Sequence, residues 1–211
     1  IILVNCSGSP IGLEPETQKC EAILQAWYPG QQGGKAVAEV LFGDYNPAGK
    51  LPVTFYRNVS QLPDFEDYNM TGRTYRYMQD VPLFPFGYGL SYTTFGYGKT
   101  VLDKNELTAG QSLKLTVPVT NTGKCNGEEV VQVYLRKQGD AEGPIKTLRA
   151  FKRVSIPAGK TVNVEFDLKD KELEWWDDQS NTVRVCPGNY DIMVGGSSKE
   201  EDLQRTTIAI K

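Results

Sequence analysis

Hydrophobic residues follow two different patterns along the chain, and the pattern changes near residue 100. From Leu113 to Val119 apolar and polar residues alternate, and alternation returns over 161–168. Further short strands are predicted in 128–136, 144–156, 189–197 and 206–210, with turn sequences between them. Alternation of this kind is typical of strands with one buried face. The second half is therefore predicted to be all-β.

About seven short strands over roughly 110 residues favour a β-sandwich of the immunoglobulin or fibronectin type III kind. The Cys–Trp–Cys spacing of true immunoglobulin domains is absent, so the fibronectin-like form is the better match. No pattern repeats between the two halves of the chain.

The first half is predicted to be α/β. The apolar run 1–7 indicates a buried parallel strand. Residues 15–30 are predicted to be a helix capped by Thr17 and stopped by Pro29 and Gly30, and 33–43 a second helix that ends at Gly43. Residues 49–56 are predicted to be a short strand. Because it contains Pro52, this strand is expected at the edge of a sheet, or with the proline at its start.

These patterns predict an α/β fragment with a parallel sheet, followed by an all-β sandwich. Residues 1–80 are assigned to the α/β part, 81–98 to an aromatic connector and 99–211 to the sandwich. The connector includes PLFPFGYGLSYTTF (82–95), whose aromatics are expected to be buried while its glycines allow close backbone passage. An aromatic-lined sugar site is the alternative for this stretch. The abrupt apolar start and the small number of strands suggest that the α/β part is incomplete.

The composition of the chain excludes several classes of function. The net charge of −3 gives no basis for nucleic-acid binding, and no apolar run is long enough to span a bilayer. Histidine is absent, so a Ser-His-Asp triad within this chain is excluded. The four cysteines are far apart and lack metal-site spacing; they are expected to be buried thiols, with a Cys125–Cys186 disulfide left open. No cofactor or metal is predicted.

The stretch GRTYRYM provides the candidate substrate-binding residues Arg73, Tyr75, Arg76 and Tyr77. Tyrosine and arginine stack on and hydrogen-bond sugar rings. The alternative is a packed strand whose arginines form interdomain ion pairs.

Other polar and aromatic groups have structural explanations beside functional ones. Glu14 and Glu16 follow the first strand, where ligands of α/β sheets bind, but they also suit a helix N-terminus. Asp64, Glu66 and Asp67 form an acidic cluster without EF-hand spacing, so a solvated loop is favoured over a Ca²⁺ site. Trp175 and Trp176 are expected to divide into one core ring and one surface ring rather than form a sugar platform.

Three long stretches resemble glycoside hydrolase family 3. Residues 22–55 resemble the late part of that family's α/β sandwich domain, and 82–95 resemble the segment that leads into its fibronectin-like domain. Residues 119–135 resemble the start of that last domain. The opening VNCSGSPIGLEPE and the stretch 44–78 are most similar to the β-xylosidase branch.

The resemblance implies a retaining β-glycosidase that releases terminal β-linked sugars from oligosaccharides, as in xylan degradation. Family members carry an aspartate nucleophile on an N-terminal barrel and an acid/base glutamate earlier in the sandwich domain. Neither motif is present here, so no catalytic residue is assigned and the chain alone is expected to be inactive. Its implied partners are the missing barrel and the oligosaccharide, and the implied location is periplasmic or extracellular. A stand-alone carbohydrate-binding or protein-interaction module is the main alternative, and a small hydrolase using the carboxylates present is a weaker one.

Overall fold

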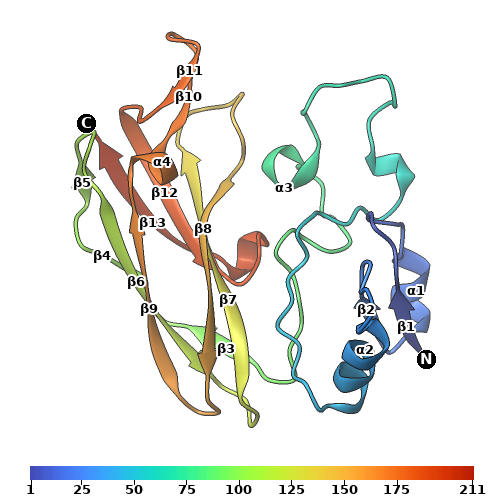
Figure 1. The fold of residues 1–211 in the computed structure, drawn as a ribbon. Coiled ribbons are helices and arrows are strands. Elements are labelled where there is room, and N and C mark those ends of the chain that lie inside the picture. Colours follow the sequence, from blue (N-terminus) through green and yellow to red (C-terminus); the bar gives the residue numbers. More distant parts are fainter.

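The computed structural model describes residues 1–211 as two parts that lie side by side (Figure 1). The N-terminal part, coloured blue to green, holds few regular elements, and the C-terminal part is a β-sandwich. No helix of the chain combines the length and the apolar character needed to cross a membrane.

The N-terminal part contains one small parallel sheet and short helices. Its elements are β1 Ile2–Asn5, α1 Glu14–Lys19, β2 Ala22–Gln25, α2 Gly33–Phe42, the 3₁₀ turn η1 Val59–Gln61 and α3 Thr74–Tyr77. Strands β1 and β2 pair in parallel, with Ile2 opposite Ala22. Helix α2 ends as predicted at Gly43, whose φ of +84° suits a residue without a side chain.

Four local predictions for this part were wrong. Strand β1 was expected to be buried, but it is exposed at Ile2 and only half-buried beyond it, because β2 is its one neighbour in the sheet. The helix expected over 15–30 stops at Lys19, and residues 22–25 form strand β2, because pairing with β1 outweighs the helical pattern. Thr17 does not cap the helix, since its hydroxyl donates to the carbonyl of Glu14. Residues 49–56 form no strand beyond one bridge between Phe55 and Phe84.

The sandwich is built from two antiparallel-dominated sheets. Its elements are β3 Phe95–Tyr97, β4 Val101–Leu102, β5 Glu106–Leu107, β6 Leu113–Asn121, β7 Gly127–Lys137, β8 Thr147–Ile156, β9 Thr161–Leu168, α4 Asp170–Leu173, β10 Trp175–Asp177, β11 Thr182–Arg184, β12 Gly188–Gly195, the 3₁₀ turn η2 Glu200–Asp202 and β13 Gln204–Ile210. One sheet has the order β5-β13-β12-β7-β8. In the other, β6 pairs with β9 and with both β3 and β4.

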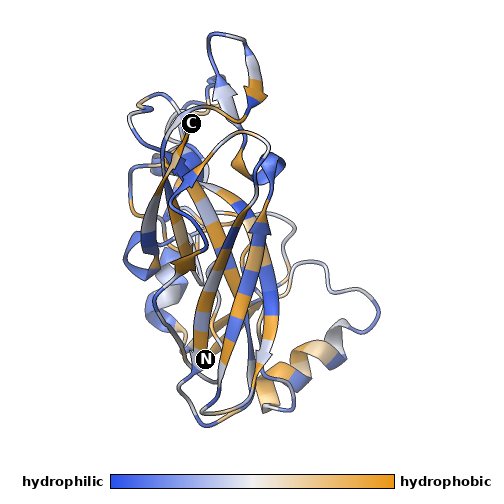
Figure 2. Ribbon diagram, turned by 90° about the vertical axis from the view of Figure 1, so that its left-hand side faces the viewer, coloured by the Kyte–Doolittle hydropathy of each residue, from blue (hydrophilic) through white to orange (hydrophobic).

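The core of the sandwich lies between these sheets and follows the predicted alternation. Leu113, Leu115, Val117 and Val119 are fully buried on β6, while the residues between them face outward or are only partly covered. Figure 2 shows this as apolar and polar bands that alternate along the strands. Burial of twenty apolar side chains in one cluster stabilises the sandwich.

The aromatic connector joins the two parts by backbone and ring contacts. Gly87 N donates to the carbonyl of Leu51 at 2.8 Å, and Ser198 N of the sandwich donates to the carbonyl of Phe86 at 2.9 Å. The ring of Phe86 stacks on Tyr75 with centroids 4.3 Å apart. The other rings of this stretch are only half-buried and Tyr92 is 52 % exposed, so the expectation that its aromatics are buried holds only in part.

Candidate functional site

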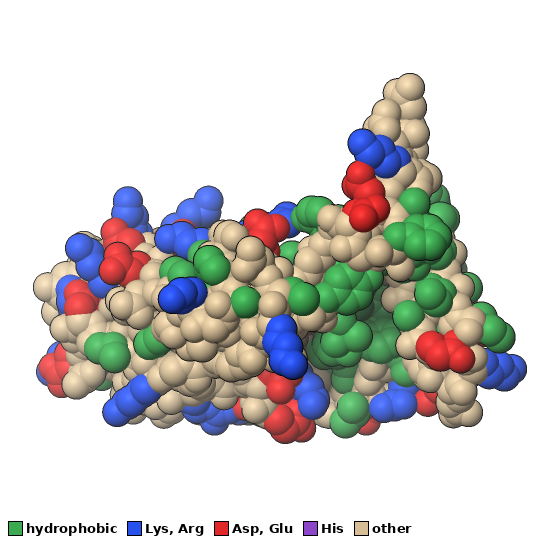
Figure 3. Space-filling model, turned by 90° about the horizontal axis from the view of Figure 1, so that it is seen from below, with side chains coloured by type: hydrophobic (Ala, Val, Ile, Leu, Met, Phe, Trp, Pro, Cys, Tyr) green, Lys and Arg blue, Asp and Glu red, His purple; other side chains and the backbone are tan.

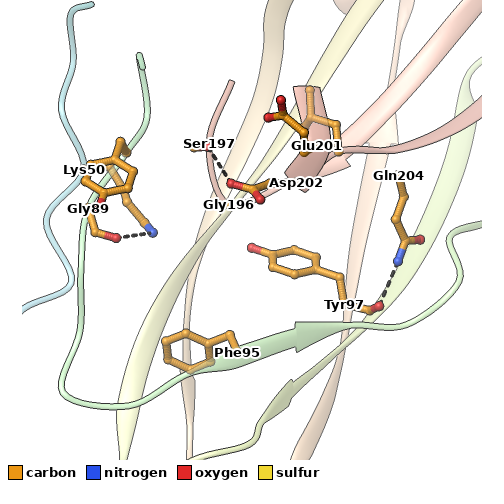
Figure 4. A pocket seen from close by; sticks show the side chains of 11 residues that line it. Lys50, Gly89, Phe95, Tyr97, Gly196, Ser197, Glu201, Asp202 and Gln204 are labelled. Carbon is orange, nitrogen blue, oxygen red and sulfur yellow. Dashed lines mark hydrogen bonds between the residues drawn. The ribbon is translucent and has the colours of Figure 1, made fainter. Parts of the chain in front are cut away.

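A cavity of about 500 Å³ lies where the connector meets the sandwich. Strand β3, the turn η2 and the N-terminal part all contribute to its wall, which is formed by Lys50, Tyr88, Gly89, Phe95, Tyr97, Gly196, Ser197, Glu201, Asp202, Leu203 and Gln204. Figure 4 shows the side chain of Tyr97 between Lys50 and Gln204, with Asp202 above its ring. Cationic, acidic and phenolic groups thus meet at the junction of the two parts.

A buried ion pair crosses this junction. Lys50 Nζ lies 2.9 Å from Glu129 Oε1, and the two side chains are only 15 % and 7 % exposed. Glu129 Oε1 also accepts from the backbone N–H of Val130 at 2.7 Å. Each charge depends on the other, because a buried ion without a partner is strongly unfavourable.

The hydroxyl of Tyr97 is buried beside this pair and has no hydrogen-bond partner. Burial raises the pKa of Tyr97, and the nearby charge of Glu129 raises it further, so the phenol stays protonated. Gly196 separates the two groups: a Cβ there would lie 3.2 Å from Tyr97 Oη and 3.6 Å from Glu129 Oε1. A side chain at this position would therefore pack tightly against the Tyr97 hydroxyl.

Gln132 is a second polar link between the parts. Its amide nitrogen donates to the carbonyl of Gly87 on the connector at 3.1 Å and to that of Gly196 at 2.6 Å. Its amide oxygen accepts from the hydroxyl of Tyr134 at 2.5 Å. One side chain that is 2 % exposed therefore ties the connector to strand β7 and to the residue that follows β12.

Three carboxyl groups of the chain have a shifted pKa, and each pKa is lowered: Glu21, Asp177 and Glu200. At Glu200 burial acts to raise the pKa, but the hydrogen bond from Lys146 and the charges of Lys146 and Arg205 outweigh it. None of these three groups therefore has the raised pKa that a general acid needs near neutral pH. The contacts at the junction support docking of the two parts.

The predicted sugar-binding residues lie in and beside helix α3, so the alternative of a packed strand is wrong. Arg73 donates to the backbone carbonyls of Asn69 and Asp67 in its own loop. Tyr75 is used in packing, since it stacks on Phe86 and its hydroxyl accepts from Leu148 N at 3.1 Å. Arg76 lies 5.5 Å from the ring centroid of Tyr77, and neither arginine forms an ion pair.

The other sequence candidates have structural roles. Glu14 pairs with Arg57 at 3.0 Å on the first turn of α1. The acidic loop is stabilised by turns in which Asp64 and Asp67 accept backbone N–H groups, and no cluster of residues suited to a metal ion is found in the chain. The two tryptophans divide as predicted, with Trp175 at 2 % and Trp176 at 48 % exposure.

All four cysteines are free, so no disulfide joins Cys125 to Cys186. The expectation of four buried thiols was also wrong. Only Cys186 is buried, whereas Cys6 and Cys125 are exposed and Cys20 is intermediate, because they lie in or near loops outside the core.

Little in the sequence points to the groups at the junction. They come from distant segments, and the hydrophobic pattern assigns each only to a strand or a loop: Lys50, Tyr97, Glu129 and Gln132. One usable signal was present: Gln132 stands among apolar residues in the middle of a strand, where an inward polar side chain requires partners.

Two family models match the chain. Residues 1–92 match the glycosyl hydrolase family 3 C-terminal domain, and residues 129–198 match the fibronectin type III-like domain. A xylan 1,4-beta-xylosidase of Xylanibacter ruminicola is 56 % identical over 210 residues, which cover 100 % of this chain and 24 % of that protein. A periplasmic beta-glucosidase of Salmonella typhimurium is 37 % identical over 94 % of this chain and 28 % of its own length.

Solved structures show the same arrangement. A β-glucosidase from Erythrobacter marinus superimposes with a TM-score of 0.86 at 40 % identity, covering 100 % of this chain and 28 % of that one. A beta-glucosidase from Listeria innocua in complex with isofagomine gives a TM-score of 0.83 at 30 % identity, over 99 % of this chain and 31 % of its own. The chain thus spans about a quarter to a third of the length of these relatives.

Proposed function

Because this chain consists of a glycosyl hydrolase family 3 C-terminal domain followed by a fibronectin type III-like domain, we propose that it is the C-terminal portion of a retaining β-glycosidase. The proposed substrate rests on one observation: the whole chain is 56 % identical to part of a protein named as a xylan 1,4-beta-xylosidase. The proposed reaction is removal of terminal β-linked xylose from oligosaccharides. Retention requires two carboxyl groups about 5–5.5 Å apart, and both are proposed to lie outside this chain, one of them on an N-terminal barrel.

The exposed apolar surface of the N-terminal part supports this proposal. Figure 3 shows hydrophobic side chains gathered in a hollow on the side of this part, whereas charged groups cover much of the sandwich side. Large apolar side chains of the N-terminal part are open to solvent, including Ile2 at 51 % and Phe42 at 83 % exposure. Ile2 belongs to the two-stranded parallel sheet, and an uncovered sheet of this kind suits extension by further strands and cover by further helices.

The proposal divides the chain into three segments. Residues 1–80 complete an α/β sandwich domain, residues 81–98 connect this domain to the β-sandwich, and residues 99–211 form the β-sandwich, which stabilises the assembly. The proposed location is periplasmic or extracellular, in line with the printed name of the Salmonella relative.

Arg73, Tyr75, Arg76 and Tyr77 remain proposed as residues at the rim of the sugar site. Of the four, Arg73 and Tyr75 already use their polar groups within the chain, so Arg76 and Tyr77 are the better candidates. A carbohydrate-binding or protein-interaction module is the second candidate function, because the ring of Trp176 is 48 % exposed at the edge of the sandwich.

The test is hydrolysis of nitrophenyl β-xyloside, α-arabinoside and β-glucoside by the 211-residue chain and by the full-length gene product. We expect turnover of the xyloside by the full-length product and none by the 211-residue chain. Turnover by the repurified 211-residue chain would overturn the placement of both carboxyl groups outside it. Absence of xyloside turnover by the full-length product, with turnover of the glucoside, would overturn the assignment of the sugar. Affinity of the 211-residue chain for xylan that Trp176→Ala abolishes would favour the binding module.

A further inference from the structure

The cavity at the junction contains a polar group that the fold leaves without a partner. Tyr97 lines this cavity of about 500 Å³, and its hydroxyl is buried and forms no hydrogen bond within the chain. Figure 4 shows the hydroxyl end of its ring directed toward the side of the cavity where Lys50 and Gly89 lie. A buried hydroxyl without a partner costs free energy, so such groups are rare in folded proteins. A bound molecule that hydrogen-bonds this hydroxyl would remove that cost.

The rings around this hydroxyl provide an apolar surface. Phe95 and Tyr97 lie two residues apart on β3, so their side chains are on the same face of the strand. Tyr88 also lines the cavity, and both Tyr88 and Phe95 belong to the aromatic stretch 82–95. All three aromatic residues are only half-buried, so part of each stays open. A tyrosine combines an apolar ring face with a polar end, which suits the C–H groups and the hydroxyls of a sugar ring.

The charges on the wall favour a ligand that is neutral and carries hydroxyl groups. Lys50 is the one cation that lines the cavity, and the buried Glu129 neutralises it at 2.9 Å. The two acids on the wall, Glu201 and Asp202, are exposed, so the cavity opens to solvent beside η2. The carboxylate of Asp202 accepts one hydrogen bond, from Ser197 Oγ at 3.5 Å. It can accept further hydrogen bonds from a ligand, whereas the wall has no free positive charge for an anion.

Neighbouring groups fix the position of Tyr97. The side-chain amide of Gln204 donates to the backbone carbonyl of Tyr97 at 2.8 Å and accepts from Thr100 N at 3.0 Å, so both of its polar atoms are engaged. Residue 196 is a glycine, and a Cβ there would lie 3.2 Å from Tyr97 Oη. The fold therefore holds the tyrosine in place and leaves its hydroxyl as the group that a ligand can use.

We propose that this cavity binds one neutral sugar unit in its pyranose form, and that Tyr97 and Asp202 contact its hydroxyl groups. The Tyr97 hydroxyl donates to one sugar oxygen, and the carboxylate of Asp202 accepts from a sugar hydroxyl. The rings of Tyr88 and Phe95 cover the C–H groups of the sugar. A cavity of about 500 Å³ lies within the usual range for small-ligand sites, roughly 300–1,000 Å³.

The class of ligand and the particular sugar rest on different observations. The class follows from the cavity, because its free donor, its free acceptor and its rings all belong to this chain. The choice of a xyloside as the first sugar to test rests on the proposed function.

The experiment is a titration of the 211-residue chain with methyl β-D-xylopyranoside, followed by the backbone N–H signals of Gly89, Gly196 and Asp202 in NMR spectra. Methyl β-D-glucopyranoside is titrated in the same way, and saturation by either sugar supports the proposal. The controls are tetrahydropyran, which is the same ring without hydroxyls, and choline chloride, which is a small organic cation. We expect the signals to shift and saturate with a midpoint of about 1–10 mM for the sugar and to stay in place for both controls.

This measurement is independent of the test of the proposed function. It records binding to the 211-residue chain, whereas the proposed function is tested by turnover in the full-length gene product. Loss of one result therefore leaves the other standing.

Three variants separate binding from folding. Tyr97→Phe removes only the hydroxyl and is expected to raise the midpoint about fivefold. It should keep or raise Tm without ligand, because it removes a buried polar group that has no partner in the fold. Asp202→Asn keeps the shape of the side chain and is expected to raise the midpoint about tenfold, since hydrogen bonds to an ionised carboxylate are lost. Tyr68→Phe is the matched control, because its ring is 90 % exposed and lies outside the cavity, and it should respond like the parent chain.

Four results would overturn the proposal. The first is the absence of saturable shifts for both sugars at about 100 mM. The second is an equal response to tetrahydropyran or to choline, which would indicate a cavity for apolar molecules or for a cation. The third is an unchanged midpoint for Tyr97→Phe or for Asp202→Asn. The fourth is a lower Tm for Tyr97→Phe without ligand, because the hydroxyl would then already have a partner in the folded chain.

Discussion

The buried pair of Lys50 and Glu129 gives the sharpest test of how the two parts are joined. At 2.9 Å and an effective dielectric constant of about 20, their gross attraction is about 6 kcal/mol, most of which offsets the desolvation of two buried charges. Lys50→Met leaves Glu129, which is 7 % exposed, as a buried charge without its partner. We expect the free energy of unfolding to fall by about 3–5 kcal/mol.

The measurement is urea unfolding at pH 7, followed by tryptophan fluorescence and circular dichroism. The double variant Lys50→Met/Glu129→Met is expected to recover most of the loss, because two apolar side chains replace the pair without leaving a charge. Lys35→Met is the matched control: it breaks an exposed pair with Glu39 at 3.6 Å and should cost less than about 0.5 kcal/mol.

The comparison between the two lysine variants decides the outcome. If Lys50→Met costs less than about 1 kcal/mol, or no more than Lys35→Met, burial does not make this pair important and our account of the junction is wrong. If the double variant is as unstable as the single one, the loss comes from packing and not from the unpaired carboxylate.

Three further outcomes are expected. Gly87→Ala should lower the free energy of unfolding, measured in urea, by at least about 1–3 kcal/mol. The φ of this residue is +78°, and the added Cβ would lie 2.0 Å from Gln132 Oε1. An unchanged urea midpoint would contradict this expectation. NMR titration of Asp177 should give a pKa of about 2, because hydrogen bonds from Ser180 and Arg184 lower it. This group therefore stabilises the folded state above its ordinary pKa of 3.8, and the stabilisation is lost as the pH falls toward 2. Arg184→Gln should move the titration midpoint of Asp177 upward. Thiol titration should label Cys186 only after unfolding and the other three cysteines in the folded chain, and a disulfide found by mass spectrometry would refute the free state of all four.

The carboxyl group of Glu200 leads to a related prediction about how stability depends on pH. Its pKa is lowered by Lys146 and Arg205, so its contribution to stability is present above its ordinary pKa of 4.5 and is lost as the pH falls below that value. Thermal melting between pH 3 and 6 should show a smaller pH dependence for Glu200→Gln than for the parent chain. Equal slopes would show that the ion pair with Lys146 does not contribute.

Elements whose pattern is local can be predicted from the order of the residues alone. Alternation over 113–119 predicts β6 because a sheet with one buried face requires a period of two, and the sandwich core has this pattern. The spacing of apolar residues and Gly43 likewise predict the position and end of α2. The division of Trp175 and Trp176 into buried and exposed rings follows from the same geometry of a strand.

Features that depend on a distant partner emerge only in the folded chain. Residues 22–25 have a helix-compatible pattern, yet they form a strand because β1 offers backbone groups to pair with. The ion pair of Lys50 with Glu129 joins segments far apart in sequence, so neither spacing nor periodicity predicts it. The bulge at Arg149 arises from the register between β7 and β8, which is fixed by packing of the whole sheet and not by the residues of one strand.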